Sequence, residues 1–141
     1  MPLMAGVADH FVQRMAERGI GALFGLPGGG GNLDLIDAAG RAGVRFVLTS
    51  TETGSALSAI GYAEVARTAG ACLTTLGPGA ASVVNGVACA HLDRTRLLVV
   101  TDAYAGGAMA SFPHQRLDHA ALLAPVTKWS VPPLDEITGS P

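Results

Sequence analysis

The sequence has few charged residues and no concentration of positive charge. Only 14% of its 141 residues are charged, and nine Lys and Arg against eleven Asp and Glu give a net charge of −2. The lysines and arginines are scattered, whereas a nucleic-acid-binding protein gathers them into a patch that contacts phosphates. We therefore expect no nucleic-acid partner.

Long apolar runs and closely spaced cysteines are missing as well. No stretch approaches the roughly twenty apolar residues that cross a bilayer, and Asp9, His10 and Arg14 interrupt the N-terminal segment where a signal peptide stays apolar. We expect a cytoplasmic protein without a membrane partner. Cys72 and Cys89 lie in apolar runs without metal-ligand spacing, which predicts buried free thiols and no metal site.

Apolar residues, by contrast, make up 49% of the chain, and they recur in short runs. The length suits one domain. Continuous apolar runs, typical of buried parallel strands, alternate with segments of helical period. The pattern predicts a three-layer α/β fold, a doubly wound and mostly parallel sheet with helices on both faces. The expected strands are residues 22–25, 44–48, 71–75 and 97–101, and the expected helices are residues 4–18, 32–42, 52–67, 79–91 and 116–123.

Two glycine-rich turns follow expected strands, and a single carboxylate lies between them in the sequence. The turns are GLPGGGG at residues 25–31 and TLGPGAASVVNG at residues 75–86. Asn32 is expected to cap the helix after the first turn. Glu52 has two interpretations: Thr49 and Glu52 fit the S/T-x-x-E capping box of a helix, or the carboxylate belongs to a ligand site at the carboxyl ends of the strands.

The motifs FGLPGG, Glu52 followed by GYAEVARTAG, TLGPGAASVVNGVACAHLDRT, HQRLD and PVTKWS occur in that order. Together they resemble the N-terminal pyrimidine-binding domain of thiamine-diphosphate enzymes, the superfamily of acetolactate synthase, benzaldehyde lyase and the 2-oxo acid decarboxylases. The likeness extends from about residue 4 to residue 130. We therefore expect a pyrimidine-binding domain at residues 1–130 and a truncated tail or linker at residues 131–141, because the family's domain ordinarily continues through another helix and strand.

The resemblance implies roles for particular residues. Glu52 would hydrogen-bond the pyrimidine nitrogen of thiamine diphosphate and so activate the cofactor, and Gln115 would reach the reacting centre. The other expected contacts are Pro27, Gly28, Thr75, Pro78 and Ser82 with the cofactor, and Gly29 and His114 with the substrate. The sequence departs from the family at Thr51, where histidine is common, and at His114, where synthases usually have phenylalanine.

Half of the family's machinery has no counterpart in this sequence. A second domain holds the diphosphate and its Mg²⁺ through a Gly-Asp-Gly motif and a downstream Asn, and neither is present. The resemblance therefore implies one half of an acetolactate-synthase-like enzyme for 2-oxo acid decarboxylation or carboligation, inactive alone. It would need a homo-oligomer or a subunit carrying the diphosphate-binding domain, and a 2-oxo acid or related small molecule as substrate.

Two other interpretations stay open from the residues. Gly77-x-Gly79-x-x-Ser82 after an expected strand, followed by Asp102, resembles an imperfect fingerprint of a Rossmann-like dinucleotide-binding protein. The apolar composition also suits a non-catalytic oligomerisation fragment. We further expect a mobile loop at residues 102–114 and a packing role for Trp129.

Overall fold

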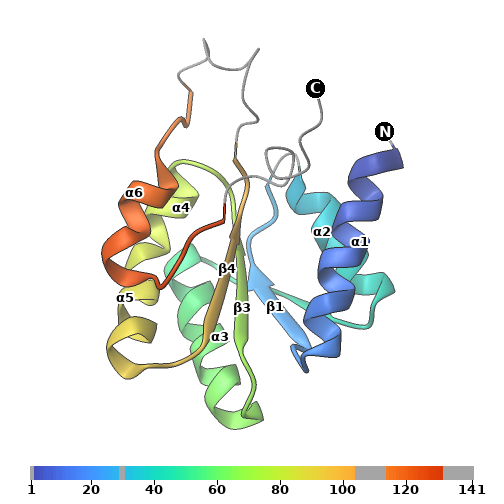
Figure 1. Ribbon diagram of the computed structural model, residues 1–141, viewed down its shortest axis with the longest axis horizontal. Coiled ribbons are helices and arrows are strands. Elements are labelled where there is room, and N and C mark those ends of the chain that lie inside the picture. Colours follow the sequence, from blue (N-terminus) through green and yellow to red (C-terminus); the bar gives the residue numbers. More distant parts are fainter. Residues whose placement is uncertain (1, 29–30, 104–113, 132–141) are drawn as a thin grey trace.

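A parallel sheet with helices on both faces forms the core of the computed structural model, which describes residues 2–28, 31–103 and 114–131 (Figure 1). The strands are β1 (Ala22–Gly25), β2 (Arg45–Leu48), β3 (Gly70–Thr74) and β4 (Leu97–Thr101), in the order β2-β1-β3-β4. All the described pairs are parallel. The expected α/β class is confirmed, and the strands lie within two residues of their predicted bounds.

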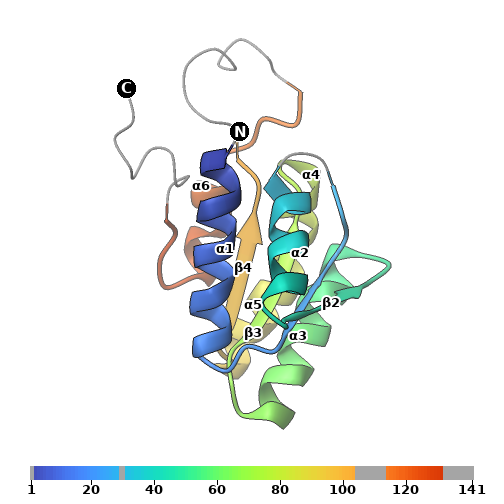
Figure 2. The same cartoon turned by 90° about the vertical axis from the view of Figure 1, so that its right-hand side faces the viewer.

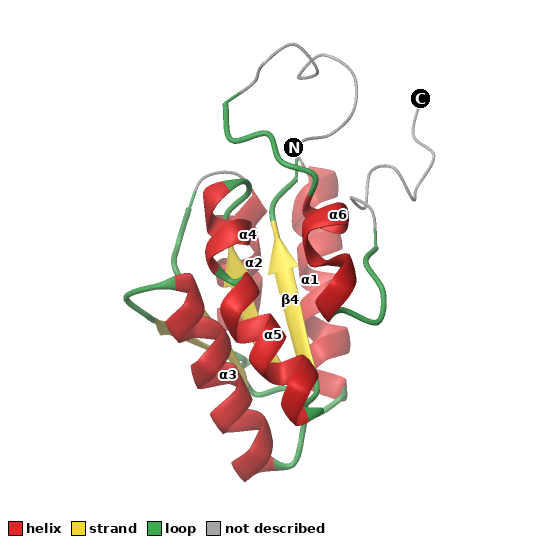
Figure 3. Ribbon diagram, turned by 90° about the vertical axis from the view of Figure 1, so that its left-hand side faces the viewer, coloured by secondary structure: helices red, strands yellow, loops and turns green. Residues whose placement is uncertain are grey.

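Two apolar layers cover the sheet. The helices α1 (Pro2–Glu17) and α2 (Gly31–Arg41) lie on one face (Figure 2), and α3 (Glu52–Ala66) and α5 (Val84–Asp93) lie on the other (Figure 3). Along β4, Leu98 and Val100 pack in the layer under α1 and α2, whereas Leu97 and Val99 pack in the layer under α3 and α5. The strands read as continuous apolar runs because side chains on both faces contact helices.

Small residues set the distance between α3 and its neighbours. Ala56, Ala59 and Ala63 of α3 are buried. A Cβ added at Gly86 of α5 would overlap the methyl group of Ala56, and one added at Gly70 of β3 would overlap the carbonyl of Ala59. The alanine and glycine content of the chain therefore serves close packing of this helix layer.

The second half of the chain contains two departures from the predicted helices. The expected helix at residues 79–91 is divided into α4 (Pro78–Ser82) and α5, with Val83 between them. The buried positions Ala80, Val83, Val87 and Ala90 keep a helical spacing across the break, so the apolar period does not reveal it. The expected helix at residues 116–123 begins later, as α6 (His119–Leu123), because Asp118 caps it by accepting from the Ala121 amide at 2.9 Å.

Several smaller predictions can also be compared with the structure. The 3₁₀ helix η2 (Ala124–Val126) leads to Trp129, which is 68% exposed in this chain, so its predicted packing role, against a following domain or linker, stays a prediction. Cys72 is a buried free thiol as expected, but Cys89 is only partly buried and donates to Asp93 Oδ2 at 3.4 Å. The predicted mobile loop at residues 102–114 and the tail lie mostly outside the described residues. Within the described part, no helix has the length and apolarity to cross a membrane.

Candidate functional site

The two glycine-rich turns meet at the carboxyl edge of the sheet. β1 and β3 are neighbours, and the chain leaves β1 for β2 on the other side, which makes the crevice between β1 and β3 a topological switch point. A Cβ added at Gly28, in the turn after β1, would overlap the methyl group of Thr75, in the turn after β3. Two predicted cofactor contacts, Gly28 and Thr75, are therefore in direct contact with each other.

Glu52 is the first residue of α3 and lies at the same edge. The helix is capped by Thr51, whose side chain accepts from the Gly54 amide at 3.0 Å. The Thr49 hydroxyl instead contacts Ser55 Oγ at 2.5 Å. The capping-box interpretation of Thr49 and Glu52 is therefore wrong, because the helix begins two residues later than that motif requires.

The Glu52 carboxylate is partly exposed and makes no hydrogen bond or ion pair with any other described residue. The first turn of a helix stabilises a negative charge, because its backbone N–H groups point toward the N-terminus. The glutamate is therefore an ionisable group held at the strand ends without a structural partner, available to a ligand.

The turn after β3 is the point at which the other parts of the site converge. Gly77 has a φ of +62°, and its N–H donates to Nε2 of His119 at 2.9 Å. A Cβ at Gly77 would overlap the carbonyl of Gln115, so only glycine fits there. Thr53, next to Glu52, donates through its hydroxyl to the carbonyl of Ser82 at 2.6 Å. These contacts place the start of α3 and the Gln115 segment on either side of one turn.

Gln115 holds a backbone conformation that non-glycine residues rarely adopt. Its φ is +59°, and it is exposed beside Gly77. Such conformations persist where the surrounding structure imposes them, and they are enriched at functional sites. The surrounding structure thus fixes the backbone of Gln115, and its side chain is exposed at the surface. His114, Pro27 and Ser82 are also exposed, and Gly29 lies outside the described residues.

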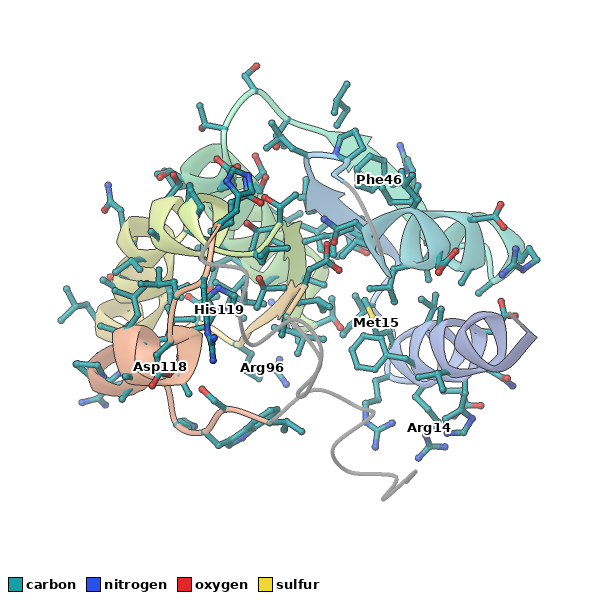
Figure 4. The ribbon with its side chains drawn as sticks, turned by 90° about the horizontal axis from the view of Figure 1, so that it is seen from above. Arg14, Met15, Phe46, Arg96, Asp118 and His119 are labelled. Carbon is teal, nitrogen blue, oxygen red and sulfur yellow. The ribbon has the colours of Figure 1, made fainter. Side chains whose placement is uncertain are left out.

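His119 is a site residue that the sequence analysis missed. It extends from α6 toward the body of the domain (Figure 4) and accepts the Gly77 N–H, so its Nε2 must be unprotonated. Burial lowers the pKa of His119, although the charge of Asp118 opposes the shift. No local motif reveals this contact, because the two residues are far apart in the sequence.

Asn32 and Asp102 form a second feature that the sequence analysis did not combine. Asn32 is fully buried, and neither atom of its side-chain amide has a partner among the described residues, so the expected capping role of Asn32 is wrong. Its backbone N–H hydrogen-bonds the carboxyl group of Asp102, whose Oδ2 is buried and unpartnered. Burial raises the pKa of Asp102 to about 6, although the hydrogen bond from Asn32 acts to lower it. Polar groups left this way are uncommon in folded proteins.

Among the described residues, no three His, Cys, Asp or Glu side chains lie close enough together to hold a metal ion. The polar groups at the carboxyl edge are instead one free carboxylate, threonine hydroxyls, backbone amides of the turns and the Asn32 and Asp102 pair. This set suits an organic ligand with hydrogen-bonding ring nitrogens better than a bare cation.

Comparison with known proteins gives consistent matches. The family model described as thiamine pyrophosphate enzyme, N-terminal TPP binding domain, matches residues 5–122. The acetolactate synthase isozyme 2 large subunit of Escherichia coli (strain K12) is 33% identical over 123 residues, 87% of this chain and 22% of that protein. The acetolactate synthase large subunit of Lactococcus lactis subsp. lactis is 35% identical over 120 residues, 84% of this chain and 21% of that protein.

A third relative, the probable acetolactate synthase large subunit of Methanocaldococcus jannaschii, is 31% identical over 121 residues, 86% of this chain and 20% of that protein. The chain thus spans about a fifth of the length of the curated relatives it matches.

Proposed function

The chain belongs to the family of thiamine pyrophosphate enzyme N-terminal domains, and from this membership we propose that it is the pyrimidine-binding half of a thiamine-diphosphate-dependent enzyme. The reaction class is decarboxylation or carboligation of a 2-oxo acid or a related small molecule. The named relatives are acetolactate synthases, which supports this class. The observation that carries the proposal is the partnerless carboxylate of Glu52 at the strand ends.

The residues at the carboxyl edge fit the pyrimidine end of the cofactor. The turn at residues 75–82 has glycine at two positions where a side chain would not fit: a Cβ at Gly79 would crowd the hydroxyls of Thr74 and Thr75, and Gly77 faces Gln115. Glycine at these points lets the turn pack closely against the two threonines and the Gln115 segment, which fixes the backbone that would lie along the ring. Glu52 supplies a carboxylate that no other described residue binds, which matches a ring that presents a basic nitrogen.

In this proposal each residue has a specific task. Glu52 holds a proton at a pyrimidine ring nitrogen, because a carboxylate beside the ring stabilises the positive charge that develops there. Thr75, Pro78 and Ser82 position the ring, and Pro27 and Gly28 approach it through their backbone. When bound, thiamine diphosphate supplies the nucleophilic carbon that adds to the substrate carbonyl. Gln115 orients the substrate, and Gly29 and His114 contribute to its binding side.

The chain acts only together with a second component. We propose that the diphosphate and Mg²⁺ bind to another domain, in a second subunit or in a further part of the same protein, and that the complex is cytoplasmic. The pyrimidine-binding domain then runs to about residue 130, and residues 131–141 form the connection. Without that component, thiamine diphosphate binds weakly and no turnover occurs.

The test is Glu52→Gln in the complete enzyme, obtained by capturing the tagged protein from its source cells with whatever copurifies. The amide keeps the shape of the side chain but cannot hold the proton. We expect the exchange of the reactive thiazolium proton of bound cofactor, measured by NMR after a pulse of deuterated water, to slow by roughly a hundredfold or more.

Glu17→Gln is the matched control, because Glu17 is an exposed glutamate that pairs only with Arg14 at 2.7 Å. Its exchange rate should equal that of the wild type. Wild-type exchange in Glu52→Gln, with cofactor bound, would rule out the proposed role. Capture of the 14.2 kDa chain with only copies of itself would instead favour a non-catalytic domain.

A further inference from the structure

A polar groove lies at the amino edge of the sheet, opposite the Glu52 site. It has a volume of about 480 Å³ and is formed by the end of α3, the end of α5 and the start of β4. Its polar lining consists of Glu64, Arg67, Thr68, Arg94, Thr95 and Arg96. The volume falls in the range of small-molecule sites, but the walls lack the aromatic and large apolar side chains that usually line them.

Positive charge dominates this groove. Three of the chain's nine Lys and Arg line it, which corrects the expectation that these residues are scattered. Within the described part, none of the three guanidinium groups is neutralised by a salt bridge. The one carboxylate of the lining, Glu64, accepts a hydrogen bond from Thr95 Oγ1 at 2.8 Å.

Two of these arginines have a left-handed backbone conformation, which glycine usually adopts. Arg67 and Arg94 end α3 and α5 with φ values of 56° and 59°. This left-handed conformation favours glycine, and the chain uses Gly19 and Gly43 with φ values of 80° and 73° after α1 and α2. Arginine therefore replaces glycine at just the two helix ends that line the groove.

Helix capping accounts for part of this arrangement. Cations interact favourably with the C-terminal end of a helix, and Arg96 donates to the carbonyl of Arg67 at 3.3 Å. That interaction leaves the guanidinium groups of Arg67 and Arg94 without a described partner. It also gives no reason for three cations from separate elements to share one groove.

We propose that this groove binds a multivalent oxyanion of the phosphate or diphosphate class, a function beyond that of the Glu52 site. Guanidinium groups match phosphate oxygens by paired hydrogen bonds, and the hydroxyls of Thr68 and Thr95 lie among them. The lining of this groove has no aromatic side chain, so any organic part of the ligand stays outside it. Free diphosphate and the phosphate groups of a larger metabolite would therefore be bound by the same residues.

The experiment is calorimetric titration of the full chain, with any subunit that copurifies and with that subunit's cofactor sites already filled by thiamine diphosphate and Mg²⁺, using inorganic pyrophosphate at constant ionic strength. We expect saturable binding below about 1 mM, weakened about tenfold by each of Arg67→Gly and Arg94→Gly. Because glycine suits the left-handed conformation, the melting temperature of both variants should be unchanged or higher. Loss of binding without loss of stability separates a ligand site from a capping role.

Two controls complete the design. Arg45→Gln removes an exposed arginine on β2 and should leave pyrophosphate affinity unchanged, as should Glu52→Gln. Titration with adenosine diphosphate distinguishes the sources: equal affinity indicates a free oxyanion, and tighter binding indicates the phosphates of a larger ligand. No saturation by about 10 mM, or equal binding by wild type and both glycine variants, overturns the proposal.

Discussion

At the scale of single residues, Asp102 is the group in which burial and hydrogen bonding act in opposite directions. Removal from water disfavours the carboxylate, and the backbone N–H of Asn32 favours it, with a resulting pKa of about 6 against an ordinary value of 3.8. The side-chain amide of Asn32 lies in the same buried region without a described partner. The native state therefore binds a proton at Asp102 more tightly than the unfolded chain does.

This difference predicts the pH dependence of stability. Between pH 3.8 and about 6 the unfolded chain releases the Asp102 proton while the folded protein keeps it, so the contribution of Asp102 is fully present below pH 3.8 and is lost as pH rises through about 6. Asp102→Asn removes this loss and should raise the free energy of unfolding at pH 7.5 by about 1 kcal/mol, after allowance for the half-exposed side chain.

Urea unfolding of wild type and Asp102→Asn at pH 4.5 and pH 7.5 measures the effect. The stability gap between the two proteins should widen toward pH 7.5 in favour of the variant. A gap of the same size at both pH values would show that Asp102 ionises normally in the folded state.

At the scale of elements, the contact between α3 and α5 depends on two very small residues. Gly86 of α5 lies against Ala56 of α3, and both are buried. Gly61 is also in α3, but it is exposed and has no atom within 4 Å of an added Cβ. The same substitution therefore meets opposite conditions at the two positions. The Thr53 hydroxyl at the start of α3 also donates a hydrogen bond to the carbonyl of Ser82. The packing of α3 on α5 and this hydrogen bond together position Glu52, the first residue of α3.

Gly86→Ala should lower the free energy of unfolding by about 1 to 3 kcal/mol, because the new methyl group forces α3 and α5 apart. Gly61→Ala should raise it by about 0.5 to 1 kcal/mol, because alanine is the better helix former and the site is open. Chemical denaturation at neutral pH measures both. Equal shifts of the same sign would contradict the close packing seen at Gly86.

At the scale of the whole molecule, large apolar side chains remain exposed on the outer helix layer. Leu57 and Val65 of α3 are 47% and 88% exposed, and they lie two helical turns apart on one side of the helix. Leu92 of α5 is 78% exposed. Burial of these side chains against another chain would be favourable, which supports the proposal that the chain works in a homo-oligomer or with another subunit.

We predict that Leu57→Glu combined with Val65→Glu weakens self-association or subunit binding by tenfold or more, because charges replace apolar contacts at the surface of α3. Sedimentation velocity over a range of concentrations measures the change. Leu33→Glu is the control, since Leu33 is 53% exposed on α2, across the sheet. A monomeric wild type without any partner, or equal weakening by the control, would contradict the assignment of this surface.

Some features of the site could be predicted from the sequence and others could not, for identifiable reasons. Glu52 and the two glycine turns could be identified because each follows a short apolar run that predicts a buried strand. The cap at Thr51 was mistaken for Thr49 because the Thr49 hydroxyl is taken up by Ser55. The contact of His119 with Gly77 joins segments 42 residues apart, and no local pattern reports such a pairing.

By itself, the sequence determined the order of helices and strands, the parallel α/β class and the position of Glu52 after a strand, because these depend on local periodicity and on apolar burial. Only the tertiary structure decided which segments meet: Asn32 with Asp102 at the carboxyl edge, and Arg67 with Arg94 and Arg96 at the amino edge. Those meetings depend on the strand order β2-β1-β3-β4. Strand order results from packing whole layers together, and no single segment contains it.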